Sequence, residues 1–239
     1  MSSFQILRLV TQGDLVYYSD EKREKQCHVL LMETCRRIKG KVSLIQAAGG
    51  FLFEGAQIEG IKRWPHTEPS EYVSITSYVE EILDQHFFDK ALRTALKKKA
   101  DFFTFGVDVF EATNDKCPFC AELVGTYDTQ KEKIIYWTGK SYPTQAEQNK
   151  LISCPNLETH CQLLNGFRVL VLGCHDLNIF SPRSRASIAA GTSKANVISQ
   201  MQQLCDRFKP QVVIQHPHTT DTPNIWNAGW SGVRSFLLK

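Results

Sequence analysis

Two hydrophobic periods alternate along this chain and predict its elements. Short apolar runs rich in β-branched or alternating positions predict strands, and stretches with an apolar residue every three or four positions predict helices. The predicted strands cover residues 4–10, 42–48, 101–110, 123–128, 133–137, 169–172, 211–215 and 233–238. The predicted helices cover residues 20–39, 77–99 and 193–208, with a short one at 145–151.

The order of these elements indicates one α/β domain. Strands alternate with helices near both ends of the chain, and the middle contains a hairpin whose turn lies at residues 129–132. No internal repeat, low-complexity segment or linker divides residues 1–239. The pattern favours a single layered domain with mixed sheets, and a chain of this length buries a substantial core.

Composition and charge narrow the class of protein. Hydrophobic residues make up 42% and charged residues 22% of the chain, which is typical of a soluble globular protein. The formal charge of +3 gives no reason to expect a nucleic-acid or membrane surface. No apolar run reaches the roughly 20 residues needed to cross a bilayer, and residues 1–18 lack a secretory signal. We therefore expect a cytoplasmic protein whose eight cysteines are reduced.

One stretch combines a buried strand with reactive side chains. The apolar run at residues 169–172 ends in Gly173, which is followed by Cys174 and Asp176. In α/β proteins ligands bind beyond the carboxyl ends of strands, so a thiol at this place is a candidate nucleophile. Cysteine is also among the most buried residue types and commonly packs as a small hydrophobic residue. The strand end alone leaves both interpretations open.

Other cysteines and histidines fit a metal site. Cys117 and Cys120 form a Cys-x-x-Cys knuckle. Further ligands for a tetrahedral zinc ion are Cys154, His160 and Cys161. Because this second group has irregular spacing, ordinary loop cysteines are the alternative interpretation.

A second histidine group follows the predicted strand at 211–215. His216 and His218 lie on one side of an extended segment, with Asp221 downstream. Hydrolytic metal sites also need carboxylate ligands, which are sparse nearby. We interpret these histidines as residues that line a pocket or lie at the surface.

The order of several short motifs resembles the nitrilase, or carbon–nitrogen hydrolase, superfamily. The segment Gly173-Cys174-His175-Asp176 is similar to the family's nucleophile motif, with histidine in the place of a tyrosine. Upstream, the predicted hairpin leads to Lys140 and then Glu147, which resemble the family's lysine and its following glutamate. Downstream, residues 212–216 and Trp226 resemble the strand and loop that wall the family's pocket.

This resemblance implies a fold, a reaction and residue roles. The implied fold is an αββα sandwich of mixed sheets flanked by helices, usually paired into a homodimer. The implied reaction is hydrolysis of a non-peptide C–N bond in a small amide or nitrile, without a cofactor. Cys174 is the implied nucleophile, Lys140 the stabiliser of thiolate and oxyanion, and Glu147 or Glu54 the base. The implied substrate-binding residues are His175, Asp176, Gly49, His216 and Trp226.

One departure from the family concerns the general base. The family carries this glutamate at the end of the second strand, where Phe51-Leu52 align the sequence so that Gly49 takes its position. A double glycine at a strand end is typical of a tight turn or a close backbone approach. Glu54 folding back past the turn is one source of a carboxylate, and Glu147 is another. The third alternative is that no base is present, and loss of a general base costs about 10² to 10⁴ in rate.

Three hypotheses therefore remain from the sequence. The first is a thiol-dependent hydrolase of a small-molecule C–N bond. The second is a catalytically impaired protein of the same fold that binds a small molecule or a partner. The third is a zinc-containing protein that uses Cys117 and Cys120.

Overall fold

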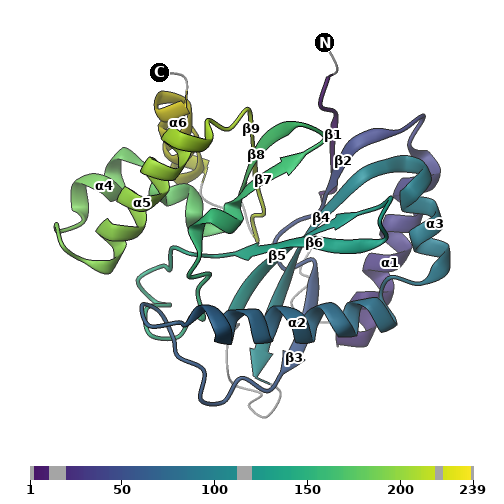
Figure 1. Ribbon diagram of the computed structural model, residues 1–239, viewed down its shortest axis with the longest axis horizontal. Helices are drawn as coiled ribbons and strands as arrows, with labels where there is room; N and C mark the ends of the chain where they lie inside the picture. Colours follow the sequence, from purple (N-terminus) through teal and green to yellow (C-terminus); the bar gives the residue numbers. More distant parts are fainter. Residues whose placement is uncertain (1–2, 11–19, 112–119, 219–222, 238–239) are drawn as a thin grey trace.

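Two mixed β-sheets form the centre of the molecule (Figure 1). The computed structural model describes residues 3–10, 20–111, 120–218 and 223–237. The large sheet has the order β1 (Ile6–Arg8), β2 (Val42–Gln46), β4 (Ala100–Glu111), β5 (Ala121–Asp128) and β6 (Lys133–Gly139), and β3 (Leu52–Ala56) also pairs with β4. The small sheet has the order β7 (Cys161–Leu164), β8 (Phe167–Leu172) and β9 (Val212–Gln215). Each sheet combines parallel and antiparallel pairs.

Side chains alternate between the two faces of each sheet and so create separate cores. On β4, Phe103 and Phe105 belong to the core under the first helices, whereas Phe102 packs toward the small sheet. On β8, Val169 and Val171 face the large sheet, and Leu170 and Leu172 belong to the core on the other side. This period of two is what a strand buried on both faces requires.

Helices cover the outer face of each sheet. Those on the large sheet are α1 (Asp20–Arg37), α2 (Pro69–His86) and α3 (Lys90–Lys99). Those beside the small sheet are α4 (Pro182–Ser187), α5 (Ser193–Phe208) and α6 (Pro223–Leu237). Two 3₁₀-helices, η2 (Leu157–His160) and η3 (His175–Ile179), flank β7 and β8. The result is the αββα order of layers that the family resemblance implies.

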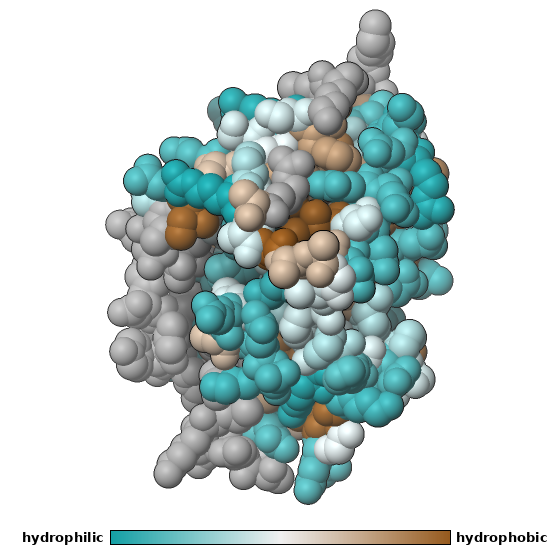
Figure 2. All heavy atoms as spheres, turned by 90° about the vertical axis from the view of Figure 1, so that its left-hand side faces the viewer, coloured by the Kyte–Doolittle hydropathy of each residue, from teal (hydrophilic) through white to brown (hydrophobic). Residues whose placement is uncertain are grey.

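The surface beside the small sheet is mainly polar. Figure 2 views the side of the molecule that carries α4, α5 and α6, where hydrophilic residues cover most of the surface and apolar ones gather near its centre. None of the helices in the described ranges combines the length and the apolar composition that crossing a bilayer requires.

The predicted helix at 77–99 is two helices. The chain breaks at Phe87 and Phe88, which are both buried, and the Phe88 ring stacks on Tyr127 with 4.2 Å between centroids. Asp89 then caps α3 by accepting the N–H of Leu92 at 2.7 Å. Burial of two aromatic rings at the break, together with a new N-cap, outweighs continuation of one helix.

Other predicted elements also differ. The predicted strand at 233–238 is wrong, because residues up to Leu237 belong to helix α6. Its glycines lie close to η3, since a Cβ atom on Gly229 would meet the Leu177 side chain and one on Gly232 the Phe180 carbonyl. The predicted helix at 145–151 is wrong too, because those residues form turns and extended chain. Strands β3 and β7 were not predicted as separate strands.

Helix α1 holds the turn between β2 and β3 from outside. The Arg23 guanidinium donates to the carbonyl of Gly50 and, at 3.4 Å, to that of Phe51. The Cys27 thiol donates to the same Phe51 carbonyl at 2.9 Å. Burial raises the pKa of Cys27 to about 12, so the thiol stays protonated and keeps its donor. Cys27 is part of the core between the helices and the large sheet.

The other side of this turn lies directly on β4. The Gly106 N–H donates to the Ala48 carbonyl at 3.0 Å. A Cβ atom on Gly106 would lie 2.6 Å from the Cα of Gly49 and 2.7 Å from the nitrogen of Gly50. Such distances are too short for real Cβ contacts, so this glycine permits the close approach that the double glycine indicates.

We expect Gly106→Ala to destabilise the fold by about 3 kcal/mol, because the added methyl group must push the turn away from β4. Urea unfolding measures the effect. Gly60→Ala is the control. Among the described residues, no atom beyond its chain neighbours lies within 4 Å of its Cβ position, so only the strain of its φ of +80° remains, about 1 kcal/mol. Equal losses in the two variants would contradict the steric explanation.

Candidate active site

Beyond the strand ends of the small sheet, the side chains on the inner face of the large sheet change from apolar to acidic. Asp108 on β4 is in register with Glu122 on β5, so both side chains lie on one face. The same faces of these strands carry Phe102 and Val124 farther along, where they pack against the small sheet. Asp108 is 1% exposed, so its carboxylate is buried.

The small sheet delivers two side chains to this place. Cys174 follows the end of β8 and His218 follows the end of β9, and Leu172 pairs with Gln215 where these strands end. The Gln215 amide donates to the Cys174 carbonyl at 2.5 Å, and the His218 backbone N–H donates to the Cys174 Sγ at 3.5 Å. Cys174 is only partly buried. The thiol is thus held at a strand end, on a residue that is partly exposed.

A close backbone approach brings the lysine loop to the same strand end. A Cβ atom on Gly173 would lie 2.9 Å from the Cα of Lys140, so these two segments touch through a glycine. Lys140 follows β6 directly, and its backbone N–H donates to the Glu122 carbonyl at 2.9 Å. The sheet ends therefore place the side chain of Lys140 next to that of Glu122.

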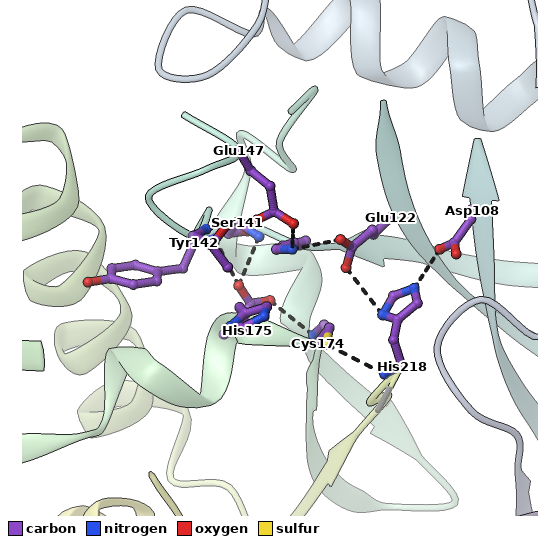
Figure 3. Close-up of polar contacts among 12 residues, drawn as sticks. Asp108, Glu122, Ser141, Tyr142, Glu147, Cys174, His175 and His218 are labelled. Atoms are coloured by element: carbon purple, nitrogen blue, oxygen red, sulfur yellow. Dashed lines mark hydrogen bonds and ion pairs between the residues drawn. The ribbon is translucent and has the colours of Figure 1, made fainter. Parts of the chain in front are cut away.

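Five charged or ionisable side chains then form one row (Figure 3). Asp108 Oδ1 lies 2.7 Å from His218 Nε2, and His218 Nδ1 lies 3.5 Å from Glu122 Oε2. Glu122 Oε1 accepts from Lys140 Nζ at 2.6 Å, and Glu147 Oε1 accepts from the same ammonium at 2.7 Å. Carboxylates and cations alternate along the row, so each charge has a neighbour of opposite sign.

Burial and these neighbours shift the ionisation of the row. Burial disfavours the imidazolium of His218, but Asp108, Cys174 and Glu122 outweigh it and raise its pKa well above the ordinary value. Burial raises the pKa of Glu122, although His218 and Lys140 oppose the shift. Burial lowers the pKa of Lys140, but Glu122 and Glu147 reverse the effect and raise it. Lys140 therefore stays an ammonium, and the imidazolium of His218 persists to higher pH than that of an ordinary histidine.

A second carboxylate fixes the loops around the thiol. Asp176 Oδ1 accepts the backbone N–H groups of Ser141 and Tyr142, each at 2.9 Å, and Oδ2 accepts that of Gly173 at 2.9 Å. Asp176 is fully buried. It therefore joins the Lys140 loop to the Cys174 loop. The resemblance implied that Asp176 binds substrate, but its two carboxylate oxygens are used by these backbone groups.

Comparison with known proteins identifies the fold. The chain matches no protein-family model, and no curated protein matches it in sequence. A carbon–nitrogen hydrolase from Helicobacter pylori G27 aligns with a TM-score of 0.50 at 12% identity, over 97% of this chain and 67% of that one. This chain has the carbon–nitrogen hydrolase fold.

Two further solved structures share weaker similarity. An amidase from Nesterenkonia sp. aligns with a TM-score of 0.48 at 8% identity, over 87% of this chain and 63% of that one. An N-terminal amidase aligns with a TM-score of 0.45 at 11% identity, over 98% of this chain and 52% of that one. This chain therefore spans less than two-thirds of the length of either amidase.

The carbon–nitrogen hydrolase fold brings only some of the predicted residues together. Cys174 lies with Glu122 and His218, and Lys140 and Glu147 belong to the same row. Glu54 does not join them. It pairs with Val109, which faces the helices, and so lies on the opposite face of the sheet from Asp108. The prediction that Glu54 folds back to the thiol is therefore wrong.

The predicted substrate-binding residues are also distributed unevenly. His175 lies beside Cys174, where burial and then Lys140 lower the pKa of its imidazole. His216 is buried, and burial lowers its pKa to about 3, so it is neutral. Gly49 lies against His216 and His218. Trp226 is half-buried on α6, where it packs with the core beside the small sheet.

Among the described residues, Cys154 and His160 contact each other, but no three of the predicted zinc ligands come together. The Cys154 thiol lies 3.3 Å from the Thr159 hydroxyl, and the His160 ring lies 2.8 Å from Ser141 Oγ and 2.6 Å from the Val171 carbonyl. These contacts are hydrogen bonds of a buried polar network. Cys117 lies outside the described residues.

Within the described ranges, another group has donor atoms close enough for a metal ion. One ligand atom each from Glu122, Cys174 and His218 lies within 4.8 Å of the others. Lys140 already neutralises Glu122, and Asp108 holds one nitrogen of His218. We assign no metal to this group, because an ammonium and a favoured imidazolium compete with a cation at this place.

Sequence reasoning missed three members of the row. Asp108 and Glu122 each interrupt an otherwise apolar strand, and an acidic residue at a buried strand position is a signal for a site. His218 was interpreted only as a pocket or surface residue, because its partners come from β4 and β5, far away in the sequence.

Asp176→Asn tests the junction between the two loops. An amide presents one oxygen and one NH₂ group, so at least one of the three backbone N–H groups that Asp176 accepts would face a donor. We expect a loss of about 3 kcal/mol in the free energy of unfolding by urea. Asp206→Asn, at an exposed position on α5, is the control and should change stability little. A similar midpoint for both variants would refute the role of Asp176.

Asp108→Asn tests the ion pair with His218 through its pH dependence. Because the pKa of His218 is raised in the folded state, the pair stabilises the fold fully below the unfolded value of about 6.5 and loses this effect as pH rises through the folded value. The variant should therefore lose about 2 kcal/mol at pH 6 and much less in alkaline solution. Urea unfolding at several pH values measures this, and a loss independent of pH would contradict it.

Proposed function

We propose that this protein is a thiol-dependent hydrolase that cleaves the C–N bond of a small amide or nitrile. One observation supports this function above the others. The thiol of the partly exposed residue Cys174, at the end of β8, lies next to a carboxylate and an imidazole, with the ligand atoms of Cys174, Glu122 and His218 within 4.8 Å of one another. Such a group at a strand end is suited to nucleophilic catalysis.

The proposed reaction class is that of a protein with a similar structure. The Helicobacter pylori protein of this fold is described as a carbon–nitrogen hydrolase, and we extend this class to the present chain as part of the proposal. Fold alone does not determine function, so the proposal depends on the chemistry of the site.

In this reaction, Lys140 provides the positive charge and Cys174 the nucleophile. The thiolate attacks the amide carbon, a C–S bond forms, and the carbonyl oxygen becomes an oxyanion. Among the described residues, Glu122 and Glu147 take two of the three N–H donors of Lys140, which leaves one for that oxyanion. Collapse releases the amine and leaves a thioester, which water hydrolyses to the acid.

Cys174→Ala tests the nucleophile. Ammonia release is measured with acetamide, propionamide and propionitrile, and the rate with any of these that the wild type hydrolyses should fall about 10³-fold or more. Cys161→Ala, which removes another partly buried thiol, should retain the wild-type rate. Hydrolysis by Cys174→Ala at the wild-type rate, or absence of hydrolysis and of any covalent Cys174 adduct with these compounds, would refute the proposed function.

A further inference from the structure

A histidine fills the space beside Gly49. A Cβ atom on Gly49 would lie 2.6 Å from the His216 carbonyl oxygen and 3.0 Å from two ring atoms of His218, and one on Gly50 would collide with the Asp108 carboxylate. The sequence resemblance puts a glutamate base at position 49, but here the imidazole from the end of β9 takes the room that such a side chain needs. The place beside the thiol therefore holds an ionisable group that comes from a different strand.

The His218 ring is fixed and still accessible. Its Nε2 is held by Asp108 Oδ1 at 2.7 Å, and its Nδ1 lies toward Glu122 at 3.5 Å. Its side chain is 23% exposed, whereas that of Asp108 is 1% exposed. A buried carboxylate thus orients one nitrogen of the ring, and the other nitrogen lies on the side of Glu122. The Cys174 Sγ lies within 4.8 Å of a ring nitrogen of His218, so a thiol, an imidazole and a carboxylate lie near one another as in other hydrolases.

The nearby carboxylates have other partners. Glu122 Oε1 and Glu147 Oε1 both accept from the Lys140 ammonium, and Glu147 Oε2 accepts the Thr144 N–H at 2.8 Å. A carboxylate that neutralises an ammonium is a weaker proton acceptor than an imidazole. The neutral imidazole of His218 is therefore a better proton acceptor than Glu147, whose pKa Lys140 lowers against the effect of burial, and Glu122 is held by the Lys140 ammonium.

We propose that His218 is the catalytic acid and base of the Cys174 reaction and that Asp108 is a positioning residue for its ring. This inference rests on the proposed function, because it assigns the proton transfers of that reaction. It also fits the glycine at position 49, where a side chain would meet both the His216 carbonyl and the imidazole.

In each half of the reaction, His218 takes one proton and gives one proton back. His218 takes the proton of the Cys174 thiol, and the thiolate adds to the carbonyl carbon. When the C–N bond breaks, the imidazolium gives this proton to the leaving nitrogen. In the second half, His218 takes a proton from water while the hydroxide oxygen adds to the thioester carbon. The C–S bond then breaks, and the proton returns to the sulfur of Cys174.

The experiment uses p-nitrophenyl acetate, whose leaving group needs no proton. The wild type should be acetylated on Cys174 and deacetylated again, with continuous release of p-nitrophenolate. In His218→Gln both half-reactions lose their base, so continuous release of p-nitrophenolate should slow by about 10² to 10⁴, and any acetyl-thioester that forms should persist. Intact-protein and peptide mass spectrometry locate the acetyl group. His86→Gln, at an exposed position at the end of α2, is the matched control and should behave as the wild type.

The pH dependence of deacylation tests Asp108. The base must be neutral, so the rate rises with pH through the pKa of His218, which Asp108 helps to raise. Asp108→Asn should move this rise to lower pH, an effect that a merely structural residue would not produce. Among the described residues, the titratable groups that interact with the ring are Asp108 from β4, Glu122 from β5, Cys174 and His175 after β8, and His216 after β9.

The outcomes separate this inference from the proposed function. Deacylation in His218→Gln at the wild-type rate would overturn the role of His218, and an unchanged pH profile in Asp108→Asn would overturn that of Asp108. Absence of acetylation on Cys174 in the wild type would instead refute the nucleophile and hence the proposed function. Urea unfolding checks that each variant is folded, and if His218→Gln does not fold, the profile of Asp108→Asn decides.

Discussion

The alternation of charge along the row from Asp108 to Glu147 is the constraint on which the site depends. Removing an ion from water costs several kcal/mol even after a protein relaxes around it, and only an opposite charge at close range offsets this cost. His218 lies between Asp108 and Glu122, and Lys140 lies between Glu122 and Glu147. Because these side chains come from different elements, the row holds only when all of these elements keep their register.

Close backbone contacts through glycine make this arrangement possible. Gly106 lets the turn after β2 lie on β4, and Gly173 lets the strand end that carries Cys174 touch the backbone of Lys140. At Gly49 the missing side chain leaves the volume that the His218 ring takes. The glycines thus set how close the two sheets come at this end, and this distance decides which side chains meet the thiol.

Patterns along the sequence predicted the layers and the Cys174 strand end, because buried strands and amphipathic helices have local periods. Helix α1, the hairpin of β5 and β6, and the strand that ends at Gly173 all follow from such periods. The helix break at Phe87 and the helical structure of α6 do not follow from local periods, because packing partners that are distant in the sequence decide them. The acid–base partners were missed for the same reason. The resemblance pointed to a carboxylate near position 49 along the chain, whereas strand pairing brings Asp108 and a histidine to that place in space.

The buried charges also bear on the choice between an enzyme and a binding protein of this fold. Apolar replacement of a buried ion pair is often neutral or stabilising, so a protein that needed only the scaffold would gain nothing from such a row. A nucleophilic thiol needs a nearby proton acceptor and a cation for developing negative charge, and neither requirement fixes the strand that must supply them. A base at the end of β9 can therefore take the place of one at the end of β2. This requires a small residue such as Gly49 at the end of β2, so that the ring from β9 fits beside the thiol.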